Sequence, residues 1–149
     1  MSMSAKTVGR WQVEVDPDCT RASYARLGPA DQDRCDCPNC RNFKTLGTRA
    51  FPSSALAMLA DLGIDYRYPA EVYRSGPVEA GRASYGGIFH FVGTLVTGDR
   101  EGEDDMGEGF SYFIHGNASV VPKVFGSQPV VQLEFNAKVP WVLSEPSVD

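Results

Sequence analysis

The chain has 149 residues, of which 42% are hydrophobic and 11% aromatic, so it can bury a core and is too apolar to stay disordered. It carries 19 acidic and 14 basic residues, and the resulting net charge of -5 disfavours nucleic acid as a partner. The sequence contains no long apolar run, so we expect no membrane span. Residues 1–10 include no apolar stretch, so we expect no secretory signal. The composition predicts a single cytoplasmic domain over residues 1–149.

The first predicted element is a strand over residues 10–15. Apolar Trp11, Val13 and Val15 alternate with polar residues, which is the period of a half-buried strand. We expect this strand to end at Asp16-Pro17. The next stretch, residues 18–34, is polar and rich in Asp, Arg, Gly and Pro, and it predicts a loop.

Three closely spaced cysteines follow, Cys35, Cys37 and Cys40, which we call the cysteine cluster. The residues between Cys37 and Cys40 are Pro and Asn, which predict a tight turn with backbone N–H groups directed at the Cys37 sulfur. Cys35 projects to the same side as Cys37 if the segment is extended. In a reducing compartment this spacing favours a metal over disulfides. We therefore predict an N-terminal four-cysteine zinc knuckle, within about residues 16–47, with these ligands: Cys19, Cys35, Cys37 and Cys40.

Other interpretations of the cysteines remain open. Iron can replace zinc in such a site, and the thiols can instead be buried and unligated. A thioredoxin-like redox pair at Cys37 and Cys40 would open a helix within a βαβ pattern, which the sequence does not predict. The nearby basic residues are interpreted as compensating the thiolate charge in preference to binding phosphate; they are Arg34, Arg41, Lys44 and Arg49.

Helix and strand signals continue to the end of the chain. A short helix is predicted within Arg41–Leu46, ended by Gly47, and a stronger one over about residues 54–62, ended by Gly63. Alternating patterns predict strands at residues 71–75, 87–97, 110–115 and 130–142. No helix separates these strands, so we predict an α+β fold. It has one or two short helices and a mostly antiparallel sheet over about residues 66–143.

Two histidines and an acidic segment are further candidate sites. His90 shares a strand face with Ile88 and Val92 and is interpreted as a structural, hydrogen-bonded histidine, although neighbouring strands can bring it to His115 in a small site. Residues 98–109 are predicted to form a solvated hairpin loop, with calcium, magnesium or a basic protein as alternative ligands. Its acidic residues are Asp99, Glu101, Glu103, Asp104, Asp105 and Glu108.

The order of motifs over residues 11–143 resembles a family of small uncharacterised bacterial proteins. The likeness rests on Cys19, on Cys-Asp-Cys-Pro-Asn-Cys-Arg-Asn-Phe at 35–43, Leu-Gly-Ile-Asp at 62–65, Pro-Ala-Glu-Val-Tyr at 69–73, Tyr-Gly-Gly-Ile-Phe-His-Phe-Val-Gly at 85–93 and Val-Pro-Trp-Val-Leu at 139–143. That family has no assigned activity. The resemblance implies a bacterial origin and one domain, and no function.

The sequence predicts a small zinc-binding protein that acts as a non-catalytic protein-binding, adaptor or immunity-type module. It identifies neither the protein partner nor the oligomeric state. One alternative is an enzyme that uses His90 and His115 with a carboxylate or Tyr112, although no motif names a nucleophile. The other is a redox switch, in which loss of the ion from the cysteine cluster loosens a binding surface.

Overall fold

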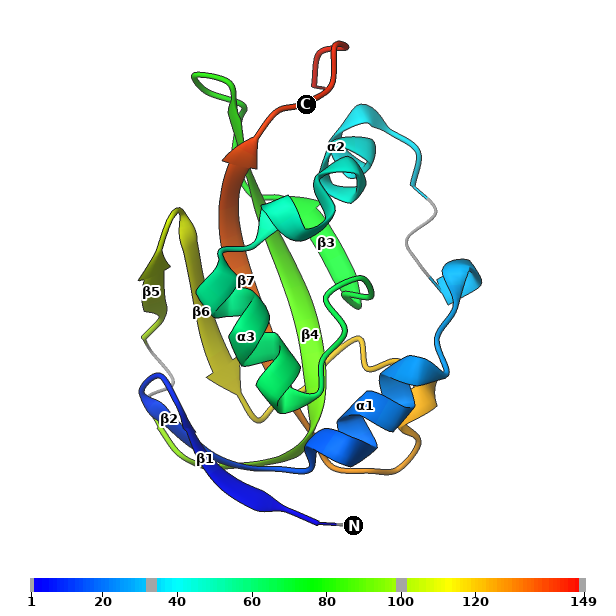
Figure 1. Ribbon diagram of the computed structural model, residues 1–149, viewed down its shortest axis with the longest axis vertical. Helices are drawn as coiled ribbons and strands as arrows, with labels where there is room; N and C mark the ends of the chain where they lie inside the picture. The colour runs from blue at the N-terminus through cyan, green and yellow to red at the C-terminus, as the bar shows by residue number, and fades with distance from the viewer. Residues whose placement is uncertain (1, 32–34, 99–101, 148–149) are drawn as a thin grey trace.

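The computed structural model describes residues 2–31, 35–98 and 102–147 (Figure 1). These residues form a seven-stranded sheet and three α-helices, which confirms the predicted α+β class. The helices are α1 (Pro17–Ala25), α2 (Pro38–Leu46) and α3 (Ser53–Leu62). The strands are β1 (Ser4–Val8), β2 (Trp11–Val15), β3 (Glu71–Arg74), β4 (Arg82–Thr97), β5 (Asp104–Gly107), β6 (Phe110–His115) and β7 (Val130–Pro140).

All strand pairings are antiparallel, as predicted, and the sheet order is β1-β2-β4-β7-β6-β5, with β3 also paired to β4. Five of the strands correspond to predicted ones. β1 and β5 were not predicted, because β1 is mostly exposed and lacks a clear alternation, and β5 lies in the acidic segment that we expected to be a loop. The prediction of a hairpin loop throughout residues 98–109 is thus wrong for β5.

β4 is the longest strand and joins the parts of the sheet. It pairs with β7 over residues 82–92, while its other edge pairs with β3 and then with β2. Two glycines allow neighbouring rings to cross it closely. A Cβ atom on Gly87 would lie 2.3 Å from the Phe135 ring, and one on Gly86 would lie 2.5 Å from the Tyr73 ring. The close approach requires residues without a side chain at both positions.

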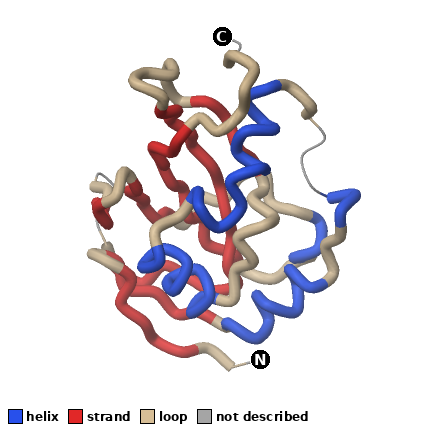
Figure 2. The backbone as a smooth tube through the Cα atoms, turned by 45° about the horizontal axis from the view of Figure 1, so that its top comes forward, coloured by secondary structure: helices blue, strands red, loops and turns tan. Residues whose placement is uncertain are grey.

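The helices lie against one face of the curved sheet, as Figures 1 and 2 show from two directions. α3 buries Ala55, Leu59 and Leu62. Beneath it, aromatic rings meet with centroid separations of 5.4–6.2 Å, within the range typical of favourable ring pairs. These rings belong to Phe51, Phe89, Phe110 and Phe135. Apolar burial at this helix–sheet contact is the main stabilising contribution to the fold.

α3 ends as the sequence predicts. Gly63 adopts a left-handed conformation with φ of 84°, and the Ile64 N–H donates to the Leu59 carbonyl at 2.9 Å. The Gly63 N–H also donates to the Ala60 carbonyl. The two bonds satisfy two carbonyls that have no partner within the helix, as is usual where a helix ends at a glycine.

α1 occupies residues that we predicted to be part of a loop. Asp16 caps it by accepting a hydrogen bond from the Cys19 N–H at 2.9 Å, and Pro17 fills the first turn, where no N–H is needed. The Tyr24 hydroxyl donates to the His90 carbonyl at 3.1 Å and so ties the helix to β4. The loop prediction for residues 18–34 is therefore wrong for α1. Residues 32–34 lie outside the described part of the chain.

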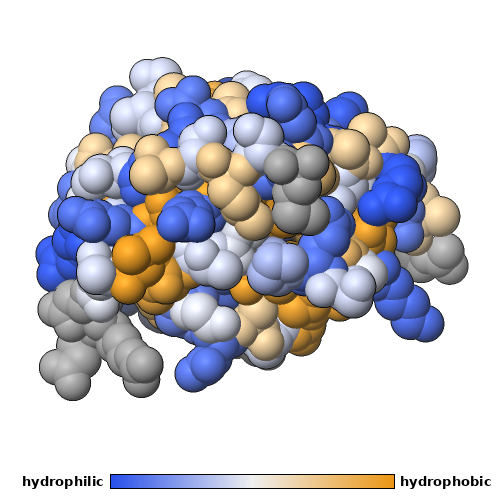
Figure 3. Space-filling model, turned by 90° about the horizontal axis from the view of Figure 1, so that it is seen from below, coloured by the Kyte–Doolittle hydropathy of each residue, from blue (hydrophilic) through white to orange (hydrophobic). Residues whose placement is uncertain are grey.

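The surface is divided between polar and apolar side chains. On the face drawn in Figure 3, hydrophobic residues form separate patches among hydrophilic ones. The large hydrophobic residues with the greatest exposure are Met3, Tyr73, Val96, Val120, Val121 and Val142. Within the described residues, each helix is too short or too polar to cross a membrane.

Candidate metal centre

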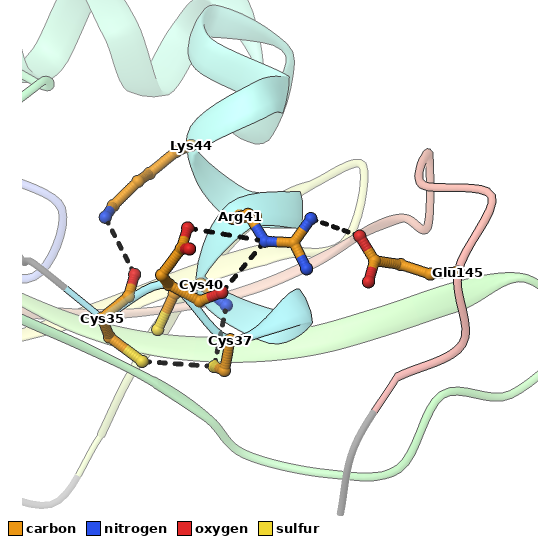
Figure 4. A network of polar contacts seen from close by, with 7 residues as sticks. Cys35, Cys37, Cys40, Arg41, Lys44 and Glu145 are labelled. Carbon is orange, nitrogen blue, oxygen red and sulfur yellow. Dashed lines mark hydrogen bonds and ion pairs between the residues drawn. The ribbon is translucent and has the colours of Figure 1, made fainter.

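The structure brings together three of the four predicted ligands. The sulfurs of Cys35, Cys37 and Cys40 all lie within 4.8 Å of one another, and the Cys35 and Cys37 sulfurs are 3.2 Å apart (Figure 4). Zinc bound by thiolates at about 2.3 Å requires sulfur separations of about 3.8 Å. The cluster therefore has the spacing to hold one metal ion. Among the described residues, no Asp, Glu or His joins this group.

The cysteine cluster lies at the N-terminus of α2. Pro38 opens the helix, three residues earlier than predicted, and Cys37 is its N-cap. The Cys37 sulfur accepts a hydrogen bond from the Cys40 N–H at 3.5 Å, as the Pro-Asn turn predicts. This backbone bond, together with a contact from Cys35, lowers the pKa of the Cys37 thiol. The thiolate is the form that binds metals.

The sheet holds the turn between Cys37 and Cys40 in place. The Asn39 carbonyl accepts a hydrogen bond from the Tyr85 hydroxyl at 2.7 Å, and its side-chain oxygen accepts one from Arg74 at 3.0 Å. One turn further along α2, the buried Asn42 donates to the Pro140 carbonyl at 3.2 Å. The Asn42 oxygen also accepts from the Val142 N–H at 2.7 Å. These contacts position the cluster through protein groups alone.

Two cations contact the backbone and the acidic groups around the cluster. The Lys44 amine donates a hydrogen bond to the Cys35 carbonyl at 3.1 Å (Figure 4). The Arg41 guanidinium donates to the Asp36 carbonyl at 3.0 Å and also forms an ion pair with Glu145. Both cations thus lie beside the cysteine cluster, and compensation of a thiolate site by their charge stays a prediction. Arg34, which we placed in the same basic group, lies outside the described residues.

Cys19 is not part of the cysteine cluster. It lies in the first turn of α1, and Figures 1 and 2 both show α1 well apart from the N-terminus of α2. A hydrogen bond to Asp16, burial and the charge of that carboxylate raise the pKa of the Cys19 thiol. The protonated thiol is a poor metal ligand. The geometry thus supports three cysteine ligands, and the site lies within the chain at α2, not at the N-terminus.

The two histidines are joined by a separate polar network on β4, β6 and β7. Both pair in register with Gln132, one from each side. His90 Nε2 bonds the Ser119 carbonyl at 2.8 Å, and His115 Nε2 contacts Glu134 at 3.0 Å. Gln132 joins the two halves by accepting from the Ser119 N–H at 2.6 Å and donating to Glu134 at 2.6 Å.

Within this network, His90 is buried and His115 is half-buried. Burial lowers the pKa of His90, so its ring is neutral near pH 7. Nε2 of His90 has the backbone hydrogen bond that its strand position predicts, whereas the buried Nδ1 has no hydrogen-bond partner among the described residues, so a purely structural role stays a prediction. The histidines face β7 from opposite edges and are not adjacent.

The acidic segment is partly engaged in internal contacts. Asp104 forms an ion pair with Arg10 at 2.8 Å, and Arg10 also donates to the Glu103 carbonyl at 3.0 Å. The Asp105 carboxylate accepts a hydrogen bond from the Gly107 N–H at 2.8 Å. Asp99 and Glu101, the other acids placed at the start of this segment, lie outside the described residues. Of the described acids, Asp104 and Asp105 lie in β5, Glu103 directly precedes it, and Glu108 lies in the turn that follows.

The residues that position the cysteine cluster were not identified from the sequence. Asn39 meets Arg74 and Tyr85 across separations of 35 and 46 residues. Such contacts depend on the packing of α2 against the sheet and leave no pattern in a single sequence. A comparison with protein-family models, curated proteins and solved structures found no match for the chain.

Proposed function

We propose that this chain is a metal-binding protein in which Cys35, Cys37 and Cys40 hold one zinc ion. The observation that supports the proposal is the convergence of three sulfurs within 4.8 Å, on a turn that the sheet holds in place. Thiolates are preferred zinc ligands, and the three sulfurs lie close enough together to contact a single ion. Iron is the alternative metal, because it also takes thiolate ligands.

Elemental analysis of protein purified without a chelator tests this proposal. We expect about one zinc per chain, lost in Cys37→Ser and retained in Cys19→Ser. The second variant is the matched control, because Cys19 lies outside the cluster. A coloured preparation that contains iron would change the assigned metal. Well-folded protein that neither carries nor takes up a divalent metal would contradict the proposal.

We further propose that the metal-loaded protein acts as a non-catalytic protein-binding module of the adaptor or immunity type. Two observations support this role. The histidines, the other candidate catalytic groups, are hydrogen-bonded in a network apart from the cysteine cluster. The chain is also acidic, with a net charge of -5, which favours a basic protein partner. A basic partner that binds an acidic surface should associate more slowly as the salt concentration rises, because salt screens the attraction. Association rates of a co-purified partner at low and high salt test this role. Rates that do not depend on salt would contradict an acidic recognition surface.

A thiol switch is the second candidate function, and the start of α2 favours it. A redox pair of the thioredoxin type opens a helix within a βαβ pattern, and Cys37 meets the first condition as the N-cap of α2, although the described strands pair antiparallel. Hydrogen peroxide can oxidise two thiolates of the cluster to a disulfide, with two protons taken up and two water molecules formed, and the metal ion is then released.

Peroxide titration of the zinc-loaded protein tests the switch. One equivalent should release zinc to a colorimetric chelator and remove two free thiols, and a reductant should restore both. Zinc that stays bound while the two thiols are lost would contradict it.

A further inference from the structure

A hollow of about 400 Å³ opens beside the cysteine cluster, at the start of α2. This volume lies within the range of known small-molecule sites. Its walls are mainly apolar, and Cys40 belongs both to the hollow and to the cluster. The principal lining residues are Cys40, Phe43, Phe51, Tyr66, Pro69 and Val72. A molecule in this hollow would thus lie next to the proposed metal ion.

The walls of the hollow are held by the core. The Phe43 ring meets the rings of Tyr85 and Phe51 with centroid separations of 5.0 and 6.1 Å. Phe51 also meets Tyr66 at 6.0 Å and is itself buried. Rings packed in this way are not free to collapse into the space, so the hollow is preformed. A preformed apolar space binds a ligand without a large ordering cost.

The cysteine cluster supplies three ligands to an ion that takes four. The chain has one further cysteine and two histidines, and none of them belongs to the cluster. The Cys19 thiol is hydrogen-bonded to Asp16. The Nε2 atoms of both histidines are hydrogen-bonded within their own network. A cysteine or histidine ligand in the fourth position would therefore have to come from outside the chain, in place of a water molecule, and the hollow borders Cys40.

We propose that the hollow binds a small thiol that carries an aromatic ring, and that its sulfur completes the coordination of the metal ion. This inference rests on the proposed metal site. The aromatic body fits the ring-lined walls, and the thiol gives its proton to solvent and replaces a water molecule on the metal. A fourth thiolate would make the site more negative by one charge, and the Lys44 cation in the lining would offset it, whereas Arg67 is already paired with Asp65. The ligand is thus defined by an apolar ring and a soft anionic donor.

Cobalt(II) substitution of the full chain, with 2-phenylethanethiol as probe, tests the inference. The cobalt–sulfur charge-transfer absorption should rise by about one third as three bonds become four. 2-Phenylethanol, which has the same ring and no thiol, should cause no rise. 2-Mercaptoethanol, which has the thiol and no ring, should require a higher concentration.

Two variants separate binding in the hollow from simple metal–thiol chemistry. Val72→Trp places a large ring in the hollow and should weaken 2-phenylethanethiol binding by about tenfold or more, with cobalt stoichiometry unchanged. Val96→Trp is the matched control, because Val96 is exposed on β4 and does not line the hollow, and it should bind as wild type does.

Each contrary result identifies which proposal fails. Cobalt that binds but does not respond to the aromatic thiol overturns this inference and leaves the metal site intact. Equal thiol affinity in Val72→Trp and wild type overturns the hollow as the binding site. Failure to take up any metal overturns the proposed function and, with it, this inference.

Discussion

Replacing Asn42 by alanine should loosen the attachment of α2 to the end of the sheet. Asn42 is buried in α2 and makes two well-formed bonds to the chain after β7, at 3.2 Å to the Pro140 carbonyl and 2.7 Å from the Val142 N–H. Each bond contributes about 1 kcal/mol, and partners left without a bond add a desolvation penalty, so Asn42→Ala should lower the free energy of unfolding by about 2–3 kcal/mol. For a chain of this length the melting temperature should fall by about 5–10 °C.

Urea denaturation of the metal-free protein, followed by circular dichroism, measures this change without a contribution from the ion. Thr45→Ala is the matched control, because Thr45 is exposed on the same helix, and it should change the free energy of unfolding by less than about 0.5 kcal/mol. If Asn42→Ala lost no more stability than Thr45→Ala, the bonds of Asn42 would not be what holds α2 to the sheet.

Two further predictions concern metal affinity and pH. Tyr85→Phe removes the hydroxyl that holds the Asn39 carbonyl and should weaken zinc binding by about tenfold in a chelator competition. The exposed Tyr73→Phe should leave it unchanged, and equal affinities would contradict the role of Tyr85. Because burial lowers the pKa of His90, its stabilising contribution is complete above about pH 6.5 and is lost as pH falls below that value. Wild type should thus lose more unfolding free energy between about pH 7.5 and 5.5 than His90→Gln; equal losses would contradict the lowered pKa.

Local patterns predicted much of this fold. Alternating residues placed β6 at Phe110–His115, and the glycine after α3 marked its end. α1 was missed although Asp16 and Pro17 form a helix start, because the same two residues also end the preceding strand. β5 was missed because its acidic residues have low strand propensity and are paired only through β6. Elements that depend on a distant partner were the hardest to predict.

The same distinction applies to the candidate site. Cys35, Cys37 and Cys40 lie within six consecutive residues, so their convergence follows from one turn. The position of Cys19 depends on how α1 packs, and one of the contacts that hold α1 is the bond between Tyr24 and the distant His90. A single sequence does not encode that contact in a recognisable pattern. Spacing therefore predicted that the three local cysteines converge, whereas Cys19 was added because the loop between it and Cys35 is long enough to fold back.

The local origin of the cysteine cluster has a consequence for the order of events during folding. The sheet requires β2 to meet β4 and β4 to meet β7, contacts between residues far apart in the chain, whereas the cluster closes within residues 35–40. Short loops close fast and at little entropic cost, so the unfolded chain can already capture an ion. An ion that binds both states stabilises the native state less. If the cluster holds an ion, removing it should then lower the free energy of unfolding by less than the metal affinity of the folded protein alone implies.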